Sequence, residues 1–177
     1  MREDDTADDL HVFETPDEAF QYVRYAGTLP DADINLGAAA LALALLFLPG
    51  VRPERYRHHL RKLGELTDEE HALRLKAGEQ DSAELRLSCL RRVLHEQQGY
   101  AGDNQNYDDI QNANLIRVIE RRRGLPVALG LLYIVAGRHC GWQVEGLNFP
   151  GHFLVRIEMD GERLIADPFR AGAEVDA

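Results

Sequence analysis

Residues 152–167 read HFLVRIEMDGERLIAD, two alternating runs that meet at Asp160-Gly161. Asp-Gly between alternating apolar runs is the strongest short signal for a β-hairpin with a two-residue turn. A turn at this dipeptide pairs Glu158 with Arg163, which have opposite charges. The same register also places the apolar side chains on one face: Val155, Ile157, Met159, Leu164 and Ala166. Two independent features therefore predict an antiparallel hairpin.

The other face of this hairpin carries His152 and Asp167. Continuing the register pairs Asp167 with Leu154, so His152 becomes its diagonal neighbour, about 7 to 8 Å away at the backbone. A carboxylate bonded to one ring nitrogen fixes the histidine tautomer and frees the other nitrogen for proton transfer. Both residues also have structural explanations, because His152 starts a strand after Pro150-Gly151 and Asp167 precedes Pro168, a common turn position. On the residues alone, both interpretations remain open.

Helical patterns precede the hairpin. The segment from Pro126 to His139 is apolar on every side, which predicts a central helix, and a further strand is expected around residues 142–147. Upstream, capping signals and apolar spacing predict six helices: one from Thr15-Pro16, one over 33–48, one from Pro53 through Leu63, one capped by Thr67 with Glu70, one over 82–98 and one over 112–123 that Gly124 ends.

A polar segment lies between the predicted helices of residues 82–98 and 112–123. Residues 99–109 read GYAGDNQNYDD, which lacks any periodicity and predicts a loop. Ordered polar loops often carry function. We therefore expect an α+β chain with an N-terminal helical region, residues 1–98, packed on a core, residues 99–177, as one compact unit.

The composition excludes several classes of function. The net charge of −10 disfavours nucleic acid, and the apolar run 36–48 is too short to cross a bilayer. The start lacks the basic and apolar blocks of a signal peptide, and Cys89 and Cys140 fit reduced core thiols, so we expect a cytoplasmic protein. The adjacent pairs His58-His59 and His139-Cys140 diverge on a helix, and no phosphate-binding pattern occurs, so neither a metal nor a cofactor is expected.

Several motifs together resemble the transglutaminase-like core, a papain-type arrangement of a central helix on a small antiparallel sheet. They are NANLIRVIERRRG (112–124), GLPVAL (124–129), LNFPGHFLV (147–155) and DPF (167–169). The resemblance is to an uncharacterised bacterial branch and extends upstream over the helices from Asp33. Members of this branch often continue into tetratricopeptide-type repeats, so this chain is expected to be a fragment or a naturally short form.

The resemblance implies where a catalytic site would lie. Active members carry Cys at the start of the central helix, His at the start of the next core strand and Asp on the strand after it. Aligning the end of the helix at Gly141 places Pro126 at the cysteine position, with His152 and Asp167 at the other two. Proline offers no nucleophile, and Cys140 is about 20 Å away at the other end of the helix.

We therefore expect a non-catalytic module that binds a peptide or protein in a degenerate cleft. The residues expected to line it are His152, Asp167, Asn148, Tyr107, Asn104 and Asn106. One alternative is a hydrolase or acyltransferase in which His152 and Asp167 activate water or another nucleophile. A second alternative is a purely structural scaffold domain. The sequence does not specify the oligomeric state.

Overall fold

The computed structural model describes residues 13–149 and 152–175. The N-terminal part is helical, as predicted. Its elements, in chain order, are α1 (Pro16–Ala26), the 3-10 turn η1 (Asp31–Asp33), α2 (Leu36–Leu46), α3 (Glu54–Lys76), α4 (Ala83–Arg91) and the π-helical turn η2 (Arg92–Gln97). Of the described helices, none is long and apolar enough to cross a membrane.

The C-terminal part combines helices with short and long strands. Its elements are β1 (Ala101–Gly102), η3 (Ile110–Ala113), α5 (Leu115–Arg121), β2 (Arg123–Gly124), α6 (Pro126–His139), β3 (Gln143–Phe149), β4 (His152–Met159), β5 (Glu162–Asp167), η4 (Pro168–Arg170) and β6 (Ala173–Glu174). β1 and β2 pair in parallel, and β3 to β6 form an antiparallel sheet in sequence order. This arrangement confirms the predicted α+β class.

The hairpin prediction is confirmed in its register. Glu158 pairs with Arg163 across β4 and β5, and their side chains form an ion pair of 3.3 Å. Val155, Ile157 and Ala166 are completely buried, as expected for the inner face. The turn residues Asp160 and Gly161 both have positive φ, 50° and 87°, which matches the geometry that Asp-Gly favours.

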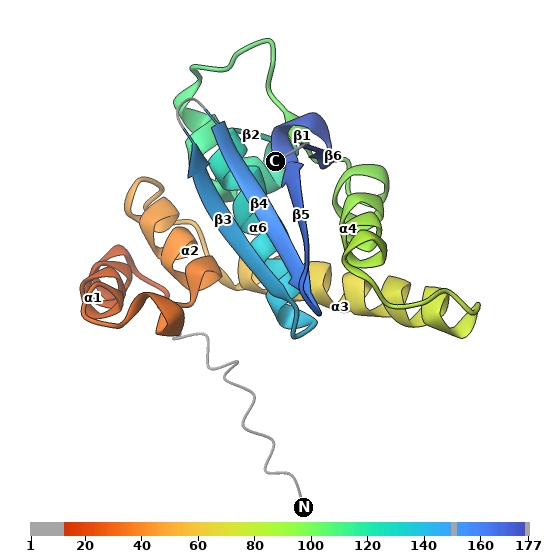
Figure 1. Cartoon of the computed structure of the whole chain (residues 1–177). Coiled ribbons are helices and arrows are strands. Elements are labelled where there is room, and N and C mark those ends of the chain that lie inside the picture. The colour runs from red at the N-terminus through yellow and green to blue at the C-terminus, as the bar shows by residue number, and fades with distance from the viewer. Residues whose placement is uncertain (1–12, 150–151, 176–177) are drawn as a thin grey trace, which may run out of the picture.

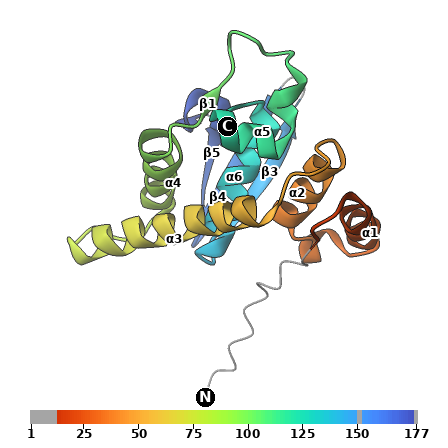
Figure 2. The same cartoon turned by 180° about the vertical axis from the view of Figure 1, so that it is seen from behind.

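α6 is the central helix, lying between the sheet and α3 (Figures 1 and 2). Glycines on α6 let the sheet approach closely. A Cβ on Gly130 would lie 2.5 Å from the ring of Phe153, and one on Gly137 would lie 2.4 Å from Val144. Phe153 also covers Gly146 of β3, where a Cβ would lie 2.4 Å from the ring. The ring therefore sets the distance between helix and sheet.

One predicted helix boundary is wrong. α3 runs without interruption through the predicted break between Leu63 and Thr67. Thr67 is buried inside this helix, where its hydroxyl donates to the carbonyl of Leu63 at 2.8 Å, so it caps nothing. Gly64 lies within this helix, and a glycine is required there because His139 of α6 packs where a side chain would stand.

A second boundary also differs. Arg122, not Gly124, ends α5, since Arg122 adopts the left-handed conformation with φ 57° and donates its N–H to the carbonyl of Val118. Gly124 instead lies in β2, and a Cβ there would lie 3.0 Å from the side chain of Val118. Close packing, rather than a helix cap, therefore explains the glycine.

Candidate functional site

Pro126 is the first residue of α6, the position that the resemblance assigns to the nucleophile. Proline suits this position because its fixed φ fits the first turn and its missing N–H would have no helical partner. The preceding residue is anchored by a bond of 3.0 Å from the N–H of Leu125 to the carbonyl of Asn112. The pyrrolidine ring itself offers no group for covalent chemistry.

Neither cysteine can replace a nucleophile at Pro126. Cys140 caps the opposite end of α6, where its Sγ donates to the carbonyl of Ala136 at 3.4 Å. Burial raises the pKa of Cys140 to about 12 and that of Cys89, in α4, to about 11. Both residues are free thiols that stay protonated near neutral pH.

His152 and Asp167 occupy the predicted strand ends but are not bonded to each other. His152 begins β4, opposite Phe149, and its side chain is exposed. Asp167 is buried, and its Oδ1 accepts a bond of 2.9 Å from the N–H of Phe169. Among the described residues, no hydrogen bond or ion pair joins the imidazole to this carboxylate.

The reason lies in the path of β5. The ladder between β4 and β5 ends at Val155–Ala166, one pair before the predicted pair of Leu154 with Asp167. Asp167 instead pairs with Ala173 of β6, and its carboxylate caps the short turn η4. Its Oδ2 lies 3.8 Å from the Nε of Arg170. Asp167 thus organises the turn that follows it.

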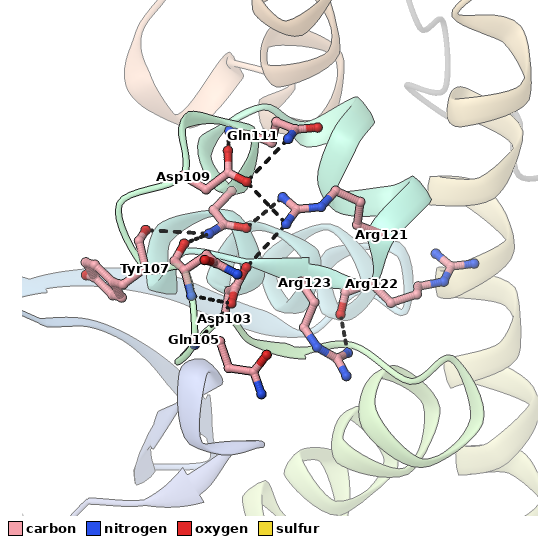
Figure 3. Close-up of polar contacts among 10 residues, drawn as sticks. Asp103, Gln105, Tyr107, Asp109, Gln111, Arg121, Arg122 and Arg123 are labelled. Carbon is pink, nitrogen blue, oxygen red and sulfur yellow. Dashed lines mark hydrogen bonds and ion pairs between the residues drawn. The ribbon is translucent and has the colours of Figure 1, made fainter.

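The segment of residues 103–112, which begins inside the polar loop of residues 99–109, is held by a cluster around Arg121 (Figure 3). The Arg121 guanidinium donates to Asn112 Oδ1 at 3.0 Å and lies 3.3 Å from Asp103 and 3.4 Å from Asp109. Asp103 also accepts bonds from the N–H groups of Asn106 and Gln105, which lower its pKa. Arg121 is therefore the residue that holds this segment against α5.

The predicted cleft residues fall into two groups. Tyr107 is half-exposed and packs edge-on against the Phe169 ring, with ring centroids 5.7 Å apart, so it lies beside the turn after Asp167. Asn104 and Asn106 are exposed on the same loop. Asn148 is exposed on β3, opposite Phe153 and one position away from the Phe149–His152 pair.

Comparison with known proteins identifies the family of this chain. A family model described as the transglutaminase-like superfamily matches residues 54–177. The chain belongs to this superfamily. The match begins at the start of α3 and takes in Pro126, His152 and Asp167. No solved structure matches the chain.

Relatives of this transglutaminase-like chain occur in bacteria and in mammals. A UPF0162 protein of Xylella fastidiosa is 40% identical over 93 residues, 52% of this chain and 33% of that protein. A UPF0162 protein of Vibrio cholerae is 36% identical over 85 residues, 48% of this chain and 32% of that protein. F-box only protein 21 of Mus musculus is 34% identical over 83 residues, 47% of this chain and 13% of that protein. The chain thus spans at most about a third of these curated relatives.

A hydrogen-bonded pair of polar residues, the half-buried His95 of η2 and the buried Tyr133 of α6, was missed by sequence reasoning. His95 donates from Nδ1 to the carbonyl of Tyr100 at 2.7 Å, so its Nε2 accepts from the Tyr133 hydroxyl at 2.6 Å. Burial raises the pKa of Tyr133, and the nearby charge of Asp167 raises it further. His95 lies in the π-helical turn η2, and no feature of the sequence predicted this turn.

A second histidine joins the same polar region. His59 of α3 contacts the Tyr100 hydroxyl at 2.7 Å through Nε2, which also accepts from Arg122 at 2.9 Å. Burial, assisted by Arg122, lowers the pKa of His59 to about 4, and burial raises that of Tyr100 to about 12. These groups stay neutral at physiological pH and tie α3 to the start of the polar loop.

Proposed function

We propose that this chain is a non-catalytic transglutaminase-like module that binds a peptide or another protein. The proposed cleft lies between the start of α6 and the ends of β4 and β5, near Pro126, His152 and Asp167. The observation that carries the proposal is Pro126 at the first position of α6, because the dipole of a helix start activates a thiol and a proline has none.

The surrounding groups support the same proposal. The two cysteines are protonated and buried or half-buried, and Cys140 lies at the other end of α6. A general base needs an orienting partner, yet the Asp167 carboxylate is already bonded to the N–H of Phe169. The alternative of a hydrolase or acyltransferase would require that carboxylate to leave its turn and reach His152.

A scaffold role is favoured by one specific observation. Asp167 caps η4 with its side chain, and the ring of Phe169 packs against Gly102, where a Cβ would lie 2.5 Å away. These contacts connect the end of β5 to the start of the polar loop. If this were the whole role of Asp167, its replacement would lower stability and leave binding unchanged.

Two site variants and two control variants separate these possibilities. His152→Ala and Asp167→Ala are compared with the exposed-residue controls His58→Ala and Asp108→Ala, in turnover of p-nitrophenyl acetate and glutamine amides and in affinity for peptides selected from a display library. We expect no turnover above the controls and weaker peptide binding for His152→Ala. Turnover that His152→Ala abolishes while the fold persists would sink the binding-module proposal. Unchanged binding combined with reduced stability in both site variants would establish the scaffold role.

Further expectations about the whole protein stay proposals. They are a cytoplasmic location, a partner that is not nucleic acid, and the presence of tetratricopeptide-type repeats after the core in longer members of the branch. The net charge of −10 is the observation that supports a protein or peptide partner over a phosphate backbone.

A further inference from the structure

The outer edge of β3 pairs with no other strand among residues 13–149 and 152–175. β3 is the first strand in the sheet order and has seven residues. Arg138 donates from Nε to the carbonyl of Val144 at 3.2 Å, which shows that the backbone groups of Val144 face away from β4. Alternate residues of a strand face the same way, so those of Gly146 and Asn148 also point outward. To the extent that the structure describes the chain, no hydrogen bond uses them.

An apolar stripe of α6 runs beside this edge. Val127, Leu131 and Val135 are spaced by four residues and therefore share one helix face, which Arg138 continues. Val127 is 50% exposed, and Leu131 and Val135 are half-buried. The bond from Arg138 to Val144 brings this stripe against β3.

α2 lies on the other side of the stripe. A Cβ on Gly37 would lie 3.2 Å from Val135, so α2 packs directly against α6 there. The neighbouring face of α2 carries Leu36 and, at helical spacing, Leu43 and Phe47, which are 48% and 74% exposed. We call the surface formed by this face, the α6 stripe and the edge of β3 the β3 groove. Beside it, a cavity of about 610 Å³ is lined by Leu36, Val135 and Arg138 together with residues of η1 and α3, and by no residue of β3.

The groove is cationic where it meets this cavity. Two arginines, Arg138 and Arg61, line the cavity, against a single acid, Asp33. Arg61 is engaged by Glu65 at 3.5 Å, whereas Arg138 is exposed and forms no ion pair with any described residue. In a chain with a net charge of −10, an arginine without a carboxylate beside an open strand complements an acidic group of a partner.

We propose that the β3 groove binds an extended peptide segment of a partner protein as an additional antiparallel strand. Its backbone pairs with Gly146 and Asn148, and its alternate apolar side chains pack between α6 and α2. Antiparallel pairing continues the pattern of the sheet and places the C-terminal end of the peptide at Arg138, where an aspartate or glutamate side chain is bound. The inference goes beyond the proposed cleft, because it places a separate peptide site at β3 that uses neither His152 nor Asp167.

The test uses the whole chain and twelve-residue random peptides displayed on phage. Enriched peptides are synthesised with blocked termini, and their affinities are measured by fluorescence anisotropy. We expect alternating apolar residues followed by an acidic residue. Leu43→Lys or Phe47→Lys weakens binding about tenfold or more, because a charge then enters an apolar contact. Leu73→Lys is the matched control, since Leu73 is 63% exposed on α3, and it leaves the affinity unchanged.

A charge exchange tests the end of the groove. Arg138→Glu is expected to weaken binding about tenfold, and replacing the acidic peptide residue by lysine restores it. Failure to enrich peptides, or equal affinity for wild type and Leu43→Lys, overturns the inference. If His152→Ala loses binding and Leu43→Lys keeps it, the peptide binds in the proposed cleft and the groove is rejected. If Leu43→Lys loses binding and His152→Ala keeps it, the peptide binds in the groove and the cleft is rejected. If the protein self-associates and Leu43→Lys abolishes this, the occupant is a second copy of the chain, and the proposed peptide partner is rejected.

Discussion

Acid should destabilise this protein through His59, and the geometry explains why. Its Nε2 accepts from Arg122 at 2.9 Å, and a guanidinium can only donate. A proton on that nitrogen would therefore face the N–H of a cation. Tyr100 contacts the same nitrogen, and His58, the next titratable group along α3, adds to the repulsion.

The magnitude follows from the two pKa values. Burial, then Arg122, lowers the pKa of His59 from 6.5 to about 4 in the folded protein. The unfolded chain binds the proton more tightly than the folded protein does. The stabilisation that neutral His59 contributes is therefore complete above about pH 6.5 and falls as the pH drops toward about 4, below which it no longer changes. The difference corresponds to about 3 kcal/mol, and solvent screening of the half-buried ring reduces it to about 2 kcal/mol.

The assay compares wild type with His59→Gln, which keeps an acceptor and does not titrate. Urea unfolding at about pH 7.5, 6.5, 5.5 and 4.5 gives the free energy of unfolding of each. We expect the advantage of wild type over the variant to shrink by about 2 kcal/mol across this range. Protons on His95 and on carboxylates affect both proteins equally and cancel in the difference. Parallel profiles for the two proteins would refute the reasoning.

Three further outcomes are expected. Arg121→Met keeps the aliphatic part of the side chain but loses three polar partners, so it should lower the free energy of unfolding by about 2 kcal/mol and expose residues 103–112 to proteolysis. The control Arg117→Ala removes only an exposed ion pair with Glu120 and should lower the free energy of unfolding by less than about 0.5 kcal/mol. Gly130→Ala should cost about 1 to 3 kcal/mol in urea unfolding, because its Cβ would meet the Phe153 ring, and adding Phe153→Leu should recover part of it; no recovery would point to another cause. Both cysteines should react with a disulfide reagent at least about a hundredfold more slowly in the folded protein than in urea, given their raised pKa values, and equal rates would contradict their burial.

The elements that the sequence predicted well are those with local causes. Asp160-Gly161 and the Glu158–Arg163 pair agreed on one register, and the structure has it. The apolar segment after Pro126 needed a central position, and α6 has one. The break expected before Thr67 was wrong because capping signals also occur inside helices. The packing of His139 against Gly64, which explains the glycine within α3, is not visible in the sequence.

The site was less accessible to sequence reasoning. The positions of Pro126, His152 and Asp167 on their elements follow from the pattern, but the choice of partner for the Asp167 carboxylate does not. That choice depends on β5 leaving β4 after Ala166 to pair with β6. The links of His95 to Tyr133 and of His59 to Tyr100 were invisible because the partners are 38 and 41 residues apart.

The Phe153 ring between Gly130 and Gly146 makes three distant positions depend on one another. A homologue with a larger residue at either glycine has no room for an aromatic ring in the middle, and one with a small residue in place of the ring leaves a void that glycines cannot fill. Substitutions at these sites should therefore be tolerated in combination and not singly. A protein engineer who wants to move the sheet relative to α6 would have to change all three together.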